Sequence, residues 1–180
     1  MTGVAGGSWP TAELDPVRRL KVLAGAGAGA GAGGRAAYAE RYFDLPPDEV
    51  WRVVSDLERE LPLLISGVRS FTPAPDAAAR AAASGEGGGL PERFTATAVS
   101  RLRHRELFEV ALRPGWCLMQ SRMLVGGMAA TAEGPGTRFA LMYSLRFPGG
   151  AGVLRLLGAG ARAEAMLDRL GGRLGVRRAG

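Results

Sequence analysis

A proline-led helix that directly follows a strand is the feature of this sequence that most constrains its fold. Phe43 ends an extended segment, and Pro46-Pro47 then opens a helix, because the first helical turn tolerates a residue without an amide hydrogen. Asp48 and Glu49 place negative charge at the positive end of the helix dipole. The apolar residues that follow recur at helical spacing and form one stripe, which consists of Val50, Val54, Leu57 and Leu61, with Trp51 beside it.

The composition indicates a single core in a reducing compartment. The chain has 180 residues, 47% of them hydrophobic, which suffices for one well-buried core. Cys117 is the only cysteine, so no internal disulfide can form. No apolar run approaches the ~20 residues of a membrane-spanning helix, and the N-terminus makes a poor secretory signal. We therefore expect a cytoplasmic protein without a membrane span.

Scattered arginines carry the positive charge. The formal net charge is +6, and Lys21 is the only lysine. Such a charge can attract a polyanion or a lipid surface, but arginine with threonine is also typical of the wet face of an antiparallel sheet. The arginines have no interleaved aromatic residues for base stacking. We expect no nucleic-acid partner, while peripheral contact with lipid stays open.

The N-terminal third of the chain predicts an extension, a strand, two helices and a second strand. Residues 1–34 end in an alternating Gly/Ala tract and are expected to form a flexible extension. A first strand is predicted from Ala37 to Phe43, and a helical pair from Pro47 to Leu61 with a break near Pro62. The second strand is predicted from Ser66 to Thr72.

The rest of the chain predicts strands and one closing helix. Residues 73–91 are rich in Ala, Gly and Pro and are expected to form a long exposed loop. Residues 92–147 alternate between strands and turns, with turns expected at Arg101–His104, Pro114-Gly115, Gly126-Gly127 and Gly134–Gly136. A helix is predicted from Val153 to about Leu174, and its glycines require that packing hold it.

The order of strand, two short helices, six strands and one long helix resembles the START-like superfamily (SRPBCC, the helix-grip proteins), including its polyketide cyclase/dehydrase-like members. The resemblance covers residues 35–177, which we take as one START-like domain. It implies an α+β fold in which a curved antiparallel sheet of about seven strands wraps around a long C-terminal helix. It also implies a ligand cavity between the sheet and that helix.

Strand alternation predicts which residues face this cavity, because paired antiparallel residues point to the same face. The Pro114-Gly115 turn places Leu112 opposite Cys117. A turn at Gly126-Gly127 would place Met123 opposite Met128 and Ser121 opposite Ala130, and Ala130 then falls with Phe139 or Leu141. The residues predicted to line the pocket are Phe94, Ala96, Ala98, Phe108, Val110, Met119, Ser121, Met128, Ala130, Phe139, Leu141 and Tyr143.

Few residues of this face could carry chemistry. Tyr143 and Ser121 are weak catalytic candidates, since a buried hydroxyl needs a partner, and Glu40 is a third. The alternative is a filled core in which small residues fit large neighbours. Cys117 has no nearby base and is expected to be inert. His104, the only histidine, is expected to be a solvated loop residue, so we expect no metal site.

Three functions remain open at this point. The first is non-catalytic binding of a small hydrophobic molecule of lipid, polyketide or isoprenoid type, without a cofactor, by a monomer or homodimer. The second is a polyketide aromatase/cyclase-type enzyme, as the resemblance implies. The third is binding of a partner through the basic outer face, with Trp116 as its exposed aromatic residue and with Arg101, Arg105, Arg113, Arg122, Arg138 and Arg146 as its charges.

Overall fold

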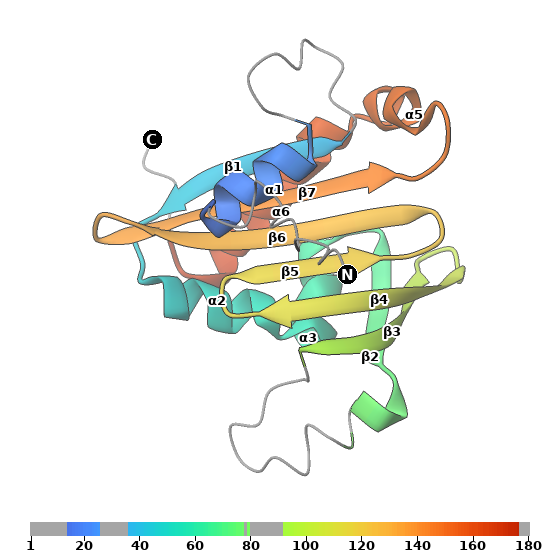
Figure 1. The fold of residues 1–180 in the computed structure, drawn as a ribbon, viewed down its shortest axis with the longest axis horizontal. Helices are drawn as coiled ribbons and strands as arrows, with labels where there is room; N and C mark the ends of the chain where they lie inside the picture. Colours follow the sequence, from blue (N-terminus) through green and yellow to red (C-terminus); the bar gives the residue numbers. More distant parts are fainter. Residues whose placement is uncertain (1–13, 26–35, 78, 80–91, 177–180) are drawn as a thin grey trace, which may run out of the picture.

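An antiparallel sheet with helices on both faces forms the fold of this computed structural model, which describes residues 14–25, 36–77, 79 and 92–176 (Figure 1). The seven strands are ordered β1-β7-β6-β5-β4-β3-β2. The predicted α+β helix-grip architecture is confirmed. The strands are β1 (Ala37–Phe43), β2 (Val68–Pro73), β3 (Arg93–Ser100), β4 (Arg105–Arg113), β5 (Trp116–Gln120), β6 (Leu124–Glu133) and β7 (Gly136–Leu145).

The helices divide between the two faces of the sheet. Behind the sheet in Figure 1 lie α2 (Pro47–Ser55), α3 (Leu57–Leu64) and α6 (Ala159–Arg173), while α1 (Pro16–Leu23) crosses its front. A further helix, α5 (Gly150–Leu156), connects β7 to α6. No helix in the described residues is long and apolar enough to cross a membrane.

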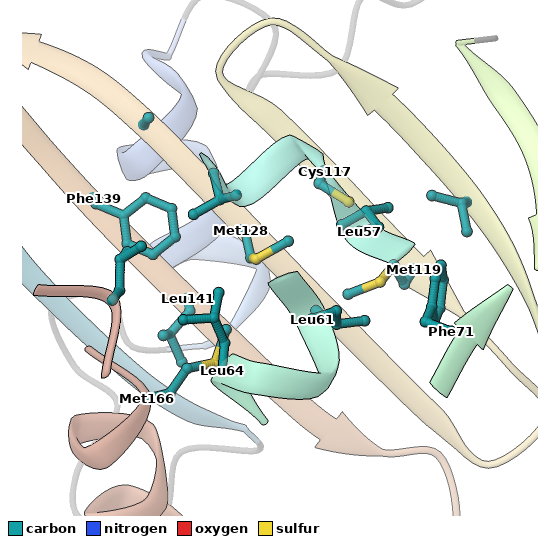
Figure 2. Close-up of a cluster of buried hydrophobic side chains, with 14 of the residues drawn as sticks. Leu57, Leu61, Leu64, Phe71, Cys117, Met119, Met128, Phe139, Leu141 and Met166 are labelled. Carbon is teal, nitrogen blue, oxygen red and sulfur yellow. The ribbon is translucent and has the colours of Figure 1, made fainter. Parts of the chain in front are cut away.

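The main core lies between the sheet and the helices behind it (Figure 2). Leu57 and Leu61 of α3 point into it, as the predicted stripe requires, and Leu64 joins them. Asp56 starts this helix by accepting a hydrogen bond from the Arg59 amide at 3.3 Å. Pro62 lies inside α3 rather than at its break, and the helix ends shortly after it at Leu64.

The C-terminal helix is divided, which corrects the prediction of one helix from Val153 to about Leu174. Gly158 has a left-handed backbone with φ of 65°, a conformation that glycine adopts without a Cβ penalty and that ends a helix. As a result α5 and α6 have different directions. Among the apolar residues of this segment, Val153 and Leu156 of α5 are exposed, while Ala163, Leu167 and Leu170 of α6 are buried.

The predicted turn at Gly126-Gly127 is wrong, because both glycines lie inside β6. The chain turns instead at residues 121–123, where the Ser121 Oγ accepts a hydrogen bond from the Leu124 amide at 2.9 Å. Cys117 therefore pairs with Met128 and Met119 with Gly126. The observed pairing of β5 with β6 differs from the predicted pairing by an even number of residues, so the same side chains stay on the same face.

The described part of the N-terminal segment contains a helix where we predicted a flexible extension. Asp15 caps α1 by accepting a hydrogen bond from the Arg18 amide at 3.1 Å. Val17 and Leu20 of α1 pack on Ala129, Ala140 and Met142 of the outer sheet face. Residues 1–13, 26–35 and most of the predicted 73–91 loop lie outside the described residues, and the domain boundary at residue 34 stays a prediction.

Leu20 should hold α1 on the sheet. It is fully buried, so Leu20→Ala should weaken this contact by about 2–5 kcal/mol. We expect faster hydrogen exchange in α1 and faster tryptic cleavage after Lys21 than in the native protein. Val22→Ala is the matched control, because Val22 is 49% exposed on the same helix. Equal exchange in both variants would show that Leu20 does not hold the helix.

Candidate functional site

A cavity of about 530 Å³ lies between the sheet, α3 and α6. Its wall is mainly apolar, with Phe71 from β2, Phe108 from β4, Met119 from β5, Met128 from β6 and Met166 from α6. Figure 2 shows that the two strand methionines, Met166 and Leu61 point toward the same interior space. Met side chains adapt their shape readily, which suits a site for apolar molecules.

The cavity opens at one end of the sheet, which we call the mouth. The exposed residues of its wall are Ser66, Gly67, His104, Arg162 and Arg169. The Arg101 amide donates to the Gly67 carbonyl at 3.0 Å, which joins the α3–β2 loop to the β3–β4 turn. The mouth is therefore formed by these loops and by the start of α6, whereas the interior of the cavity is formed by strands and helices.

Only part of the residue set predicted from alternation reaches this cavity. Ala98, Phe108, Met119, Met128, Leu141 and Tyr143 are in its wall. The others lie outside the wall in the buried part of the sheet, and these are Phe94, Ala96, Val110, Ser121, Ala130 and Phe139. Alternation determines the face of a residue but not its position along the strand. The role of any of these residues in ligand binding stays a prediction.

Tyr143 joins the sheet to α6. Its hydroxyl donates a hydrogen bond to the Ala159 carbonyl at 2.5 Å. Burial raises the pKa of this hydroxyl, and the nearby Arg162 opposes the shift. A phenol whose proton is already donated to the backbone is a poor proton donor for a ligand, so this contact indicates a structural role.

Ser121 and Glu106 form a polar pair at the same end of the sheet. The Ser121 hydroxyl donates to the Glu106 carboxylate, which also accepts from the Met123 amide at 3.4 Å. Glu106 is in the cavity wall and Ser121 is not. Ser121 is therefore mainly a turn residue that holds the carboxylate in place.

Glu106 and His104 are site residues that our sequence analysis missed. Both are in the cavity wall, and His104 is also the exposed loop residue that we expected. The pattern contained the necessary information, because they precede Phe108 by two and four residues and so share its face at the strand period.

Comparison with known proteins identifies the family of this chain. The family model "Polyketide cyclase / dehydrase and lipid transport" matches residues 43–170. The chain belongs to this family. No curated protein matches the sequence.

Solved structures show the same fold. TTHA0849 from Thermus thermophilus is 25% identical, with a TM-score of 0.53, and the match covers 77% of this chain and 96% of that one. The KanY protein (ms6282) is 16% identical, with a TM-score of 0.55 and the same coverage. The Bacillus halodurans protein BH1534 is 14% identical, with a TM-score of 0.53 over 75% of this chain and 93% of that one.

Glu40 of this polyketide cyclase and lipid transport family member lies away from the cavity, which corrects our third catalytic candidate. It is on the outer face, where it accepts hydrogen bonds from the Tyr38 hydroxyl at 2.5 Å and the Lys21 ammonium at 3.3 Å. The Tyr38 hydrogen bond is the main cause that lowers the pKa of Glu40, while burial raises the pKa of Tyr38. The Lys21–Glu40 ion pair helps to hold α1 on the sheet.

The outer face of this family member is less open than we expected. Trp116 is only partly exposed, and the Arg19 guanidinium of α1 lies 5.0 Å from its ring centroid. Arg138 forms an ion pair with Glu133, and Arg113 with Glu92. Two of the six arginines predicted for the basic face are thus neutralised by acidic neighbours, and α1 covers part of Trp116.

Cys117 should be unreactive in the native protein. It is fully buried, and burial raises the pKa of its thiol to about 12. At pH 8 we expect almost no modification by a thiol-specific disulfide reagent until the protein is unfolded in guanidinium chloride, because the thiolate is the reactive form. Rapid modification of the folded protein at pH 8 would contradict this expectation.

Within the described residues no group of three or more metal-binding side chains is present.

Proposed function

We propose that this protein binds a small hydrophobic molecule in the cavity between its sheet and α6. The observation that carries the proposal is the cavity itself, with a volume of about 530 Å³ and a mainly apolar wall. Protein interiors are packed as densely as organic crystals and leave few voids larger than a water molecule. A cavity of this size falls in the range of ligand sites, about 300–1,000 Å³.

The distribution of polar groups supports an amphiphilic ligand. The strand and helix side chains of the interior are apolar, whereas Glu106, His104 and Arg162 lie toward the mouth. A ligand with an apolar body would place that body among the methionines and its polar end among these three side chains. Molecules of lipid, polyketide or isoprenoid type have this form.

A polyketide aromatase/cyclase-type enzyme is the second candidate, and Glu106 favours it. Its carboxylate is in the cavity wall and is held by Ser121, as a positioned base would be. The other catalytic candidates are engaged elsewhere, since Tyr143 donates to Ala159 and Ser121 donates to Glu106. Glu106→Gln would separate the two functions, because it removes a base while it keeps the shape of the wall.

Fluorescence titration with N-phenyl-1-naphthylamine, an uncharged apolar probe, tests the proposal. We expect saturable enhancement with one site per chain and displacement by long-chain fatty acids. Turnover of a poly-β-keto substrate that disappears in Glu106→Gln, with probe binding unchanged, would favour the enzyme. Absence of saturable probe binding would contradict both functions.

A further inference from the structure

Exposed apolar side chains gather at the mouth end of the sheet. Leu102 at the β3–β4 turn is 92% exposed, and Leu156 of α5 is 88% exposed. The amide of Arg146, just after β7, donates to the Met123 carbonyl at 2.8 Å, so the path to α5 runs beside the β5–β6 turn. Figure 1 shows α5 and both turns at the same end of the molecule. The further large apolar side chains exposed there are Met123, Phe147, Val153 and Leu157.

Packing of α5 explains why these side chains face outward. Leu154 is buried against Ala37 and Ala159. The helix therefore packs on the sheet through the side that carries Leu154. Val153 and Leu156 lie on other faces and contact solvent. Scattered exposed apolar residues are normal, but a group on neighbouring loops at one end of a protein marks an interaction site.

The charge around this group has one sign. Three segments form it, residues 101–105, 121–123 and 145–162, and they contain no Asp or Glu. Their basic residues are all exposed, and these are His104, Arg101, Arg103, Arg105, Arg122, Arg146, Arg155 and Arg162. The nearest carboxylate in the sequence, Glu106, is hydrogen-bonded to Ser121. Leu102 thus stands between Arg101 and Arg103 at the tip of its turn.

We propose that the mouth end docks on a bilayer that contains anionic phospholipids. Guanidinium groups bind phosphate through paired N–H donors, and arginines attract an anionic surface across the water layer. Leu102, Leu156 and their neighbours then enter the boundary between headgroups and acyl chains. An acidic protein would match the arginines but would not require two leucines that are almost fully exposed. Docking in this orientation turns the mouth of the cavity toward the membrane.

Co-sedimentation with vesicles tests the proposal. Wild-type protein should bind vesicles of phosphatidylcholine mixed with phosphatidylglycerol, should release them as salt increases, and should not bind pure phosphatidylcholine. Leu102→Glu and Leu156→Glu should each weaken binding about tenfold or more, because each removes apolar burial. Arg122→Gln and Arg155→Gln should each weaken it about fivefold. These side chains are exposed, so the variants should fold normally.

Two controls place the binding surface. Leu107→Glu adds the same charge at a leucine that is 63% exposed on the outer face of β4, and Arg59→Gln removes an exposed charge of α3; both should bind like wild type. Gly126→Leu, which fills the cavity, should also bind vesicles normally. Vesicle docking and ligand binding are thus tested separately, and either one can fail while the other persists. The proposal is overturned by absence of binding to anionic vesicles, by equal losses in Leu156→Glu and Leu107→Glu, or by loss of binding in Gly126→Leu. It is also overturned if the protein binds immobilised polyglutamate but not vesicles.

Discussion

Gly126→Leu should abolish binding of N-phenyl-1-naphthylamine while leaving the fold intact. Gly126 lies in the cavity wall, opposite Met119 in the sheet. A Cβ at this position would meet only the ends of two flexible side chains, Met119 Cε at 3.4 Å and Leu124 Cδ2 at 3.9 Å. The leucine side chain would therefore extend into the space that we assign to the ligand. We expect the probe affinity to fall more than about tenfold, because the ligand loses the contacts it makes there.

A size series and a distant control make this result specific. Gly126→Ala should weaken binding only slightly, since one methyl group occupies little of the cavity. Gly172→Leu is the matched control, because a Cβ at Gly172 meets no atom within 4 Å and this residue is outside the cavity wall. Thermal unfolding should show that Gly126→Leu is as stable as the wild type. Wild-type affinity in Gly126→Leu would place the ligand elsewhere.

Leu167→Ala should lower the free energy of unfolding by about 2–5 kcal/mol, the usual cost of a leucine removed from a packed core. Leu167 is fully buried on α6, the helix that closes the cavity. This helix contains several glycines and has little intrinsic stability, so packing and ion pairs hold it. Arg41 of β1 contacts Asp168 at 2.8 Å and Glu164 at 2.9 Å, and Arg173 forms an ion pair with Glu60 of α3.

Urea unfolding followed by circular dichroism measures this loss. Leu156→Ala is the control, because it makes the same change at a leucine that is 88% exposed and should shift stability by less than about 0.5 kcal/mol. Similar midpoints for the two variants would show that burial of α6 does not stabilise the fold.

Local patterns predicted the elements of this fold well where short-range chemistry decides them. The first strand, Ala37–Phe43, has the predicted bounds, and α2 starts at Pro47 as the proline and the acidic residues after it indicate. The Pro114-Gly115 turn is also present, with Leu112 opposite Cys117 as expected. In each case the residues that determine the structure are neighbours in the sequence.

The errors arose where distant contacts decide the structure. Gly126-Gly127 has the composition of a turn, yet a Cβ at Gly127 would lie 2.6 Å from Leu20 Cδ1 of α1. The glycine at 127 leaves room for Leu20 of α1. The residues next to it in the sequence do not indicate that a helix packs there. Sequence signs of α1 itself were present but unused, since Asp15-Pro16 is a typical helix start and Val17 and Leu20 lie on one helical face.

The candidate site was predicted in part for a similar reason. Alternation placed Phe108 and Phe139 on the same face of the sheet, but only Phe108 reaches the cavity. Phe139 packs against Phe43, with ring centroids 6.4 Å apart, in the filled part of the core. The division between filled and empty core depends on where α2, α3 and α6 cross the sheet, which the strand pattern does not contain.

Native mass spectrometry of protein purified from its own host tests the central claim, ligand binding in this cavity, most directly. Wild-type protein and Gly126→Leu should be compared in the same host under native and denaturing conditions. We predict that the native wild-type protein carries the extra mass of a small molecule, that denaturation releases this molecule, and that Gly126→Leu carries none. The same small molecule bound in equal amount by both proteins would contradict the account.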